Sequence, residues 1–449
     1  MQSFKVEDVL RATKGKLLSG ENKEIKGVIT DSRKVFGGEL FIPFKGERAD
    51  GHDYIKDVLK KGAAAALSQE DIKTKGTLIK VDDTLTALGA LAKEYLKMYR
   101  IPVVGVTGSV GKTSTKDMIS GVLESKYNVL KSTGNHNNEI GMPLTVFDME
   151  KEHNMAVFEM GMSAFGELNY LADIARPDVA VITNIGMSHI ENLGSQEGIL
   201  KAKLEMCDFF EEDNVLFVNG DDKFLKDVSG EFKVIRYGMG KNCDIQASDI
   251  DDRGILGTHF TITVSGKHQP VYVKAPGVHN VYNAMAAIGI GMHYGISLEA
   301  AAKAVEEVVL TDMRMTIEEI SDVTILKDFY NAAPDSVRAS LSVLKSVKEK
   351  RRVAVLGDIL ELGDFSKEEH RKLGDSLYEC ADVLVTAGEN AKFIAEGAKA
   401  LGMKEVYQFD NTDEAARNIK SITKPGDCIL IKASRGMRFE KIYEKYEEK

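Results

Sequence analysis

The sequence predicts an α/β protein of three domains, on three observations. The chain has 449 residues, which is longer than a chain that a single hydrophobic core usually organises. Its hydrophobic fraction of 43% and charged fraction of 29% are typical of a folded globular protein. Apolar runs alternate with helical segments in two separate series, which is the pattern of parallel sheets covered by helices. We therefore expect domains at residues 1–99, 100–311 and 312–449.

The first expected domain is a small α/β unit. Residues 1–99 mix short apolar runs with glycine-rich turns, as in ITDSRKVFGGELFIPFKGERADGHDYI. A helical pattern from Leu85 to Tyr99 ends this unit.

The second expected domain is a parallel sheet with helices on both faces. It begins with a buried strand at Ile101–Val106 and a helix at Lys112–Ser125, and further strands are expected in MAVFEM, VAVIT and VLFV. Between Asp244 and Lys274 the pattern changes to a small antiparallel excursion. A helix at His279–Tyr294 then returns the chain to the domain.

A second alternating series follows Thr311. Strands are expected in VTILKDFY, RVAVLGD, ADVLVTAG and DCILIKAS, with helices at Asp335–Lys350 and Lys367–Cys380 between them. This alternation predicts a separate Rossmann-like domain.

Composition excludes several classes of protein. The net charge of -10 argues against general affinity for nucleic acid, because no surplus of cations is present to neutralise phosphates. No apolar segment has the length of a signal-peptide core or a bilayer span, so we expect a cytoplasmic protein without membrane insertion. The four cysteines lie far apart and form no metal-binding or redox pair, which predicts reduced thiols.

The segment TGSVGKTS lies between an expected strand and an expected helix, which is the setting of a phosphate loop. Gly108 and Gly111 let backbone N–H groups turn toward phosphates, Lys112 would neutralise phosphate oxygens, and the Thr113 hydroxyl would bind Mg²⁺. A chance glycine-rich turn is the alternative. The expected ATP-binding residues here are Thr107, Gly108, Ser109, Val110, Gly111, Lys112, Thr113 and Ser114.

Two further residues follow expected strands, where parallel sheets bind ligands. Glu159 ends the run MAVFEMG and His189 follows VITNIGMS, so both are candidate metal ligands beside the loop. Each has an ordinary alternative, a solvated turn carboxylate and a structural histidine. Lys203, in ILKAKLEM, reads by itself as part of a charged helix face.

The shortened Gly-x-x-Gly-Lys-Thr loop after Thr107 resembles the Mur ligase and folylpolyglutamate synthase superfamily; Val106 stands where ordinary phosphate loops have glycine. In Mur ligases a lysine in an Ala-Lys-x-Glu setting is carbamylated and binds a second Mg²⁺. Ala202, Lys203 and Glu205 match that setting. The resemblance thus implies Lys112, Glu159, His189 and Lys203 as catalytic residues, and Thr113, Glu159, His189 and carbamylated Lys203 as ligands of Mg²⁺.

The resemblance extends over essentially the whole chain. GVHNVYNAMAA, TDMRM and LKDFYNAAPDS are similar to nucleotide-contacting elements of the family, which implies ATP contacts at Asn280, Asn283, Arg314 and Asp328. TGNHNNEIGMPLT resembles the segment that approaches the muramoyl substrate, and the first domain matches the UDP-binding pattern, although turn chemistry and structural glycines are equally open there. The implied substrate-binding residues are Ser32, Arg33, Lys45, Gly46, Asp50, Gly51, His52, Thr133, Asn135, Asn137 and Asn138.

Two elements discriminate within the family. FYNAAPDS and VLGDILELGDFSKEEH resemble the member that adds D-alanyl-D-alanine, and the Asp-Asn-Pro-Arg motif of the diaminopimelate-adding member is absent. The resemblance implies an ATP-dependent monomeric ligase acting on UDP-N-acetylmuramoyl-tripeptide and D-alanyl-D-alanine through an acyl phosphate. The rivals are another ligase of the superfamily and a nucleotide-dependent regulatory protein, but the chain has no Asn-Lys-x-Asp guanine-reading motif.

Overall fold

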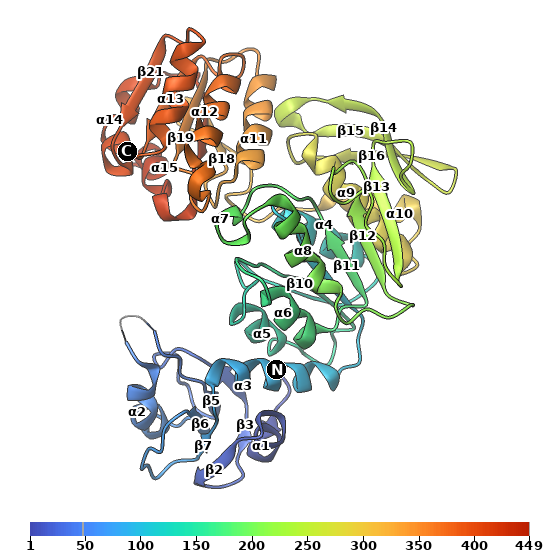
Figure 1. Cartoon of the computed structure of the whole chain (residues 1–449), viewed down its shortest axis with the longest axis vertical. Coiled ribbons are helices and arrows are strands. Elements are labelled where there is room, and N and C mark those ends of the chain that lie inside the picture. The colour runs from blue at the N-terminus through green and yellow to red at the C-terminus, as the bar shows by residue number, and fades with distance from the viewer. Residues whose placement is uncertain (47–48, 449) are drawn as a thin grey trace.

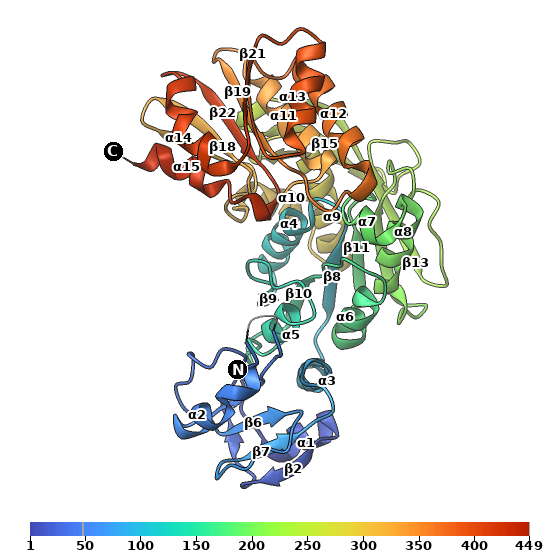
Figure 2. The same cartoon turned by 60° about the vertical axis from the view of Figure 1, so that its left-hand side comes forward.

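The computed structural model describes residues 1–46 and 49–448, which form three α/β lobes arranged in a row (Figures 1 and 2). In Figure 1 the blue N-terminal lobe lies at the bottom, the green part of the second lobe in the middle with its yellow part at the upper right, and the orange and red C-terminal lobe at the upper left. The expected class, α/β with three domains, is confirmed. No helix in the described part of the chain combines the length and apolar character needed to cross a membrane.

The first lobe is built on a mainly parallel sheet. The described strands follow the order β2 (Lys16–Ser19), β7 (Leu78–Lys80), β6 (Ala65–Ser68), β5 (Glu39–Phe41) and β4 (Gly27–Ile29), and only β2 runs antiparallel to its neighbour. The other elements are the strand pair β1 (Phe4–Lys5) and β3 (Glu24–Ile25), and the helices α1 (Val6–Thr13), α2 (Ile55–Lys60) and α3 (Thr84–Lys97).

Helix α3 attaches this lobe to the second. The helix begins where the Asp83 side chain accepts a hydrogen bond from the Thr86 N–H at 2.7 Å. Further along, Lys93 pairs with Asp173 of the second lobe at 2.7 Å, and Tyr95 donates to the Met149 carbonyl at 3.3 Å. These two contacts near the C-terminal end of α3 hold the first two lobes together.

The second lobe contains a nine-stranded sheet, counted over the described residues. Its order is β16 (Lys267–Val273), β15 (Thr258–Val264), β14 (Ile245–Asp252), β13 (Lys233–Gly238), β12 (Val215–Asn219), β11 (Val179–Ile182), β8 (Val103–Thr107), β10 (Met155–Glu159) and β9 (Val129–Lys131). Strands β14 to β16 form the expected antiparallel excursion, but it is not a separate unit, because β14 pairs in parallel with β13 and thereby extends the main sheet.

Helices cover both faces of this sheet. Val104 and Val106 of β8 belong to the core beneath α4 (Lys112–Glu124), α9 (His279–His293) and α10 (Leu298–Glu307), whereas Val103 faces the opposite core. That opposite face carries α6 (Glu167–Ala175) and α8 (Gln196–Leu204). The short helices α5 (Gly141–Val146) and α7 (Ile190–Leu193) complete the lobe.

The third lobe has the expected Rossmann-like layers. Its described strands follow the order β17 (Thr316–Ile320), β18 (Val323–Lys327), β22 (Cys428–Lys432), β19 (Arg352–Gly357), β20 (Val383–Ala387) and β21 (Glu405–Phe409). The helices are α11 (Pro334–Ser346), α12 (Ser366–Leu377), α13 (Ala391–Ala400), α14 (Thr412–Ile422) and α15 (Glu440–Glu447). The edge strands β17 and β21 lie outside the predicted strands, because neither is a continuous apolar run.

Candidate active site

The phosphate loop has the geometry that its sequence predicts. Strand β8 is fully buried and leads into Gly108 (φ 151°) and Gly111 (φ 82°), and α4 begins at Lys112. A Cβ at Gly108 would lie 1.8 Å from Thr183 Oγ1, so only glycine fits there. Thr183 in turn donates to the Val110 carbonyl at 2.6 Å, which fixes the middle of the loop.

Asn184 contacts the loop, although it is not among the predicted site residues. Its side-chain oxygen accepts from the Val110 N–H and its amide donates to the Val110 carbonyl, both at 3.0 Å. The residue directly follows Thr183 at the end of β11, so its position after a strand of the expected sheet was the available signal.

The two side chains predicted to meet phosphate and metal lie inside the site. Lys112 donates to the Gly108 carbonyl at 2.8 Å, and burial lowers the pKa of its ammonium group. The Thr113 hydroxyl accepts a hydrogen bond from Arg314 at 3.1 Å. Arg314 stacks on Tyr330, 4.1 Å from its ring centroid, so a residue of the linker reaches the phosphate loop.

Glu159 is buried at the end of β10 with one oxygen paired. Its Oε1 accepts from the Asn137 amide at 2.7 Å, whereas its Oε2 has no hydrogen-bond partner among residues 1–46 and 49–448. A buried carboxylate oxygen left without a partner is costly in a folded protein. The atom therefore fits a cation held at this position.

His189 reaches the third lobe. Its Nδ1 atom lies 2.6 Å from Glu361 Oε2, although the N–H is not aligned for a hydrogen bond. Both residues have left-handed backbones, with φ of 62° and 64°. A sequence reading could not pair them, because they lie in different lobes.

Lys203 is buried, whereas Lys201 on the same helix is exposed. Burial and the nearby Lys112 charge lower the pKa of Lys203 well below its ordinary value. The Glu205 carboxylate accepts from the Gly166 N–H at 2.9 Å and so caps α6. Glu205, the glutamate that matches the Ala-Lys-x-Glu setting, thus stabilises the start of α6.

One cavity of about 1010 Å³ joins the second and third lobes. Of the predicted residues it is lined by Ser109, Val110, Gly111, Lys112, Thr113, Ser114, Asn135, Asn137, Asn138, Glu159, His189, Asn280, Asn283, Arg314 and Asp328. Those outside its lining are Thr107, Gly108, Thr133, Lys203, Ser32, Arg33, Lys45, Gly46, Asp50, Gly51 and His52. The described part of the first lobe therefore contributes no wall to this cavity.

Two predicted nucleotide contacts have structural partners of their own. Asn283 accepts from Thr115 at 2.9 Å and donates to Asn280 at 2.9 Å, which packs α9 against α4. Asp328 accepts from the buried Lys432 ammonium at 2.6 Å. Lys432 lines the cavity at the end of β22 and was absent from the predicted site.

The predicted UDP-binding residues form a separate group in the first lobe. Arg33 is exposed and pairs with Asp31 at 2.8 Å. His52 is buried, with Nδ1 at 2.7 Å from the Asp50 carboxylate and Nε2 accepting from the Gln69 N–H at 3.3 Å, so both ring nitrogens are engaged within the protein.

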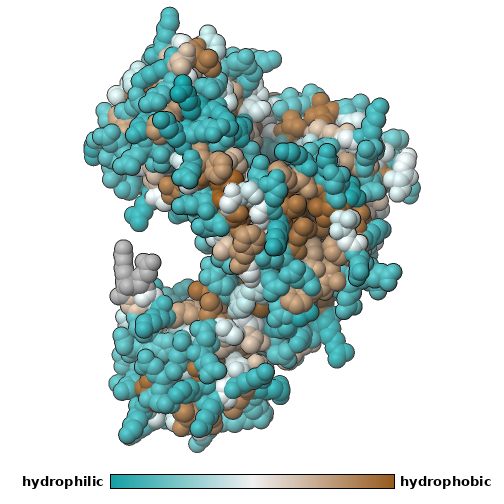
Figure 3. Space-filling model, in the orientation of Figure 1, coloured by the Kyte–Doolittle hydropathy of each residue, from teal (hydrophilic) through white to brown (hydrophobic). Residues whose placement is uncertain are grey.

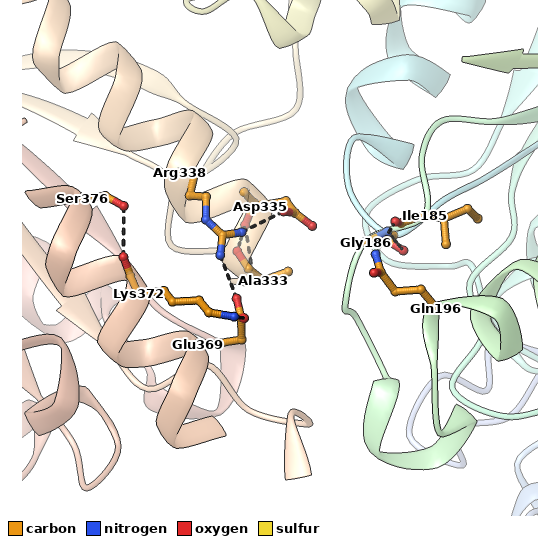
Figure 4. A network of polar contacts seen from close by, with 11 residues as sticks. Ile185, Gly186, Gln196, Ala333, Asp335, Arg338, Glu369, Lys372 and Ser376 are labelled. Atoms are coloured by element: carbon orange, nitrogen blue, oxygen red, sulfur yellow. Dashed lines mark hydrogen bonds and ion pairs between the residues drawn. The ribbon is translucent and has the colours of Figure 1, made fainter. Parts of the chain in front are cut away.

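The third lobe approaches the phosphate loop through helix α11. A Cβ on Gly186 would lie 2.4 Å from Asp335 Oδ2, so the two lobes meet at the glycine. Asp335 is held by Arg338 at 2.9 Å, and Arg338 is held by Glu369 at 2.7 Å (Figure 4). Gly186 itself donates to Ser109 of the loop at 2.9 Å.

The chain is similar to known proteins over its whole length. Three family models match the chain: the Mur ligase family catalytic domain over residues 24–96, the Mur ligase middle domain over 106–291, and the Mur ligase glutamate ligase domain over 313–435. A UDP-N-acetylmuramoyl-tripeptide--D-alanyl-D-alanine ligase of Bacillus subtilis is 43% identical and covers 97% of both chains. The Escherichia coli protein of the same name is 31% identical and covers 96% of both.

Solved structures of similar fold are also known. A crystal structure of MurF from Acinetobacter baumannii is 31% identical with a TM-score of 0.93 and covers 100% of both chains. The MurF ligase of Thermotoga maritima in complex with ADP is 29% identical with a TM-score of 0.84, and covers 94% of this chain and 97% of that one. This chain therefore belongs to the Mur ligase family.

Proposed function

We infer that this chain is an ATP-dependent amide ligase of peptidoglycan assembly that joins D-alanyl-D-alanine to UDP-N-acetylmuramoyl-tripeptide. The observation that carries this function is the cavity in which the phosphate loop faces the FYNAAPDS element of the third lobe. The full-length likeness to relatives of that name supports the same substrates, and the ADP complex of the Thermotoga maritima ligase supports a nucleotide in this cavity.

The reaction has two steps. A carboxylate oxygen of the tripeptide bonds to the γ-phosphorus of ATP, the bond from that phosphorus to the β–γ bridging oxygen breaks, and ADP leaves. The dipeptide amine then bonds to the carbonyl carbon of the acyl phosphate, the carbon–oxygen bond to the phosphate group breaks, and the nitrogen loses a proton. Lys112 and Arg314 offset the charge that gathers as carboxylate and phosphate approach.

We propose that Thr113, Glu159, His189 and the carbamate of Lys203 hold Mg²⁺. The unpaired Oε2 of Glu159 supports this assignment, because it is a hard oxygen donor in a buried position. A carbamate on Lys203 would add an oxygen ligand to those of Thr113 and Glu159. Bound Mg²⁺ would neutralise phosphate oxygens and the reacting carboxylate.

Carbamylation of Lys203 suits its surroundings. Burial and the positive charge of Lys112 act on its ammonium group, and both disfavour the charged form. Burial favours the neutral amine, whose nitrogen can bond to CO₂ with loss of one proton. The product is an anion beside Lys112, whose positive charge attracts it.

The muramoyl substrate would extend from the first lobe to the cavity. We propose that Ser32, Arg33, Lys45, Gly46, Asp50 and Gly51 bind the UDP part, with His52 shaping their loop, and that Thr133, Asn135, Asn137 and Asn138 guide the peptide. Figure 3 shows a hollow between the first and third lobes that leaves room for a long substrate.

The organisation of the enzyme follows from this substrate path. The domains proposed are 1–99, 100–311 and 312–449, and the working form is a monomer, since one chain supplies every proposed site. The cytoplasm is the proposed location, because ATP is supplied there.

The deciding experiment measures ADP release by the purified protein. We expect turnover only when ATP, UDP-N-acetylmuramoyl-tripeptide and D-alanyl-D-alanine are all present, with the pentapeptide identified by mass spectrometry. Equal turnover with a folate and glutamate would refute the assignment in favour of a folylpolyglutamate synthase. Nucleotide binding without turnover that depends on the amine would indicate a regulatory protein.

A further inference from the structure

The linker between the second and third lobes lies against one face of helix α4. Arg314 donates to the Thr113 hydroxyl at 3.1 Å. Three residues earlier, the backbone N–H and the hydroxyl of Thr311 both donate to Asp117 Oδ2, at 2.9 and 2.8 Å. The helix that begins in the phosphate loop therefore holds the linker at two points.

A third contact continues the same face. A Cβ on Gly121 would lie 2.6 Å from Val308 Cγ2, so the absence of a side chain makes room for the linker. Positions 113, 117 and 121 are four residues apart and form one stripe on a helix. The stripe meets linker positions 314, 311 and 308 in reverse order, so the linker runs antiparallel to α4.

Asp117 is itself fixed in place. Its Oδ1 lies 2.7 Å from the Lys116 ammonium, which also donates to the Ser132 carbonyl at 3.0 Å, and both charged residues are buried. A buried carboxylate with partners on both oxygens is held by the protein and not by solvent. It is a rigid anchor for Thr311.

The linker needs such an anchor. Met313 and Met315, on either side of Arg314, have left-handed backbones with φ of 61° and 53°. Such backbones are unfavourable for residues other than glycine and persist where surrounding contacts impose them. The contact of Thr311 with α4 lies just before this strained segment, and the contact of Arg314 lies at its centre.

We infer that Asp117 is a positioning residue of the ligase: through Thr311 it sets Arg314 at the phosphate loop, and Gly121 leaves space for the linker to dock. The inference rests on the proposed function, in which Arg314 offsets phosphate charge. It also explains why an acidic residue and a glycine occupy the linker-facing stripe of this helix.

A double-mutant cycle on the full-length enzyme tests Asp117. We expect Asp117→Asn to lower kcat about tenfold in the wild-type background and less than about twofold in an Arg314→Ala background, because interacting residues are non-additive. Glu124→Gln, on the same helix but paired with Lys131, is the control and should keep kcat within about twofold. An equal loss in both backgrounds, or none in either, would overturn the inference.

Gly121 provides a second test that does not depend on Asp117→Asn folding. Gly121→Ala should keep or raise the melting temperature, because alanine favours the helix, while kcat falls several-fold as the linker is displaced. Adding Val308→Ala should restore kcat by removing the colliding methyl group. Full activity of Gly121→Ala, or a loss that Val308→Ala leaves unrepaired, contradicts linker docking.

Wild-type turnover in the same assay separates the two claims. An inactive wild-type protein would refute the proposed function. An active wild type in which both tests fail would refute only the positioning role of Asp117.

Discussion

At the scale of single residues, two lysines on α8 show how position decides chemistry. Lys201 is exposed, with its ammonium 5.9 Å from the Phe165 ring centroid, whereas Lys203 is 1% exposed. Residues two apart on a helix point to different sides. The first is a surface cation, and the second has the burial and lowered pKa that favour a carbamate.

We expect Lys203→Ala to lower turnover by about a hundredfold or more with the fold retained, because a metal ligand is lost. Acetate should restore part of the activity by occupying the vacated space. Lys201→Ala is the matched control and should resemble wild type. Steady-state rates with and without acetate, and ¹³C NMR with labelled CO₂, measure the effect. If the two alanine variants were equally active, the carbamate would have to be abandoned.

At the scale of elements, His370 joins helix α12 to the turn that contains Glu361. Its Nδ1 donates to the Ser366 carbonyl at 2.7 Å, and its Nε2 accepts from the Ile359 N–H at 3.0 Å. These bonds require the neutral ring, and burial lowers the pKa of His370 below its ordinary value. Protonation would therefore loosen the turn that reaches His189.

This pKa shift predicts that the third lobe is less stable in mild acid. Below about pH 6.5 the unfolded chain binds a proton that folded His370 resists. The free energy of unfolding therefore falls by up to about 1.4 kcal/mol for each unit by which the pH is lowered. Above that pH the ring is neutral in both states, so His370 no longer makes the free energy of unfolding depend on pH. Urea unfolding followed by hydrogen exchange in α12 at pH 7.5, 6.5 and 5.5 measures the slope.

His370→Gln should be less stable at pH 7.5, since it loses part of the bonding, but should show a flatter pH dependence. His268→Gln, at an exposed position on β16, should keep the wild-type slope. An unchanged slope in His370→Gln would show that another group causes the acid sensitivity.

At the scale of the whole molecule, the approach of the third lobe completes the cavity. The chain Lys372–Glu369–Arg338–Asp335 braces the carboxylate that meets Gly186, as Figure 4 shows. Arg338 contacts Asp335 directly, and Glu369, itself paired with Lys372, holds Arg338 in turn, which favours this position of the Asp335 side chain. A glycine at the meeting point allows the close approach.

Gly186→Ala should therefore hold the lobes further apart. We expect turnover to fall on the order of ten- to a hundredfold, since a small displacement of reacting groups is costly, and the radius of gyration in X-ray scattering to increase. Adding Asp335→Ala should return the scattering curve toward wild type, because it removes the colliding carboxylate. A Gly186→Ala protein as compact and active as wild type would exclude this contact as the point of closure.

The sequence by itself determined the α/β class, the three lobes and the phosphate loop, because these depend on local patterns. Apolar runs such as that of β8 and the spacing of Gly108, Gly111 and Lys112 specify strand, loop and helix within a few residues. Edge strand β21 escaped prediction because its residues are largely exposed and give no apolar run.

Only the tertiary structure decided which distant side chains meet. The docking of the linker on α4 brings Thr311 to Asp117, and the approach of the third lobe brings Glu361 to His189. The burial of Lys203 depends on how α8 packs on the sheet. The predicted UDP-binding residues lie outside the cavity, because none of the described residues of the first lobe line it. Such contacts depend on the packing of elements far apart in the chain, which no local periodicity encodes.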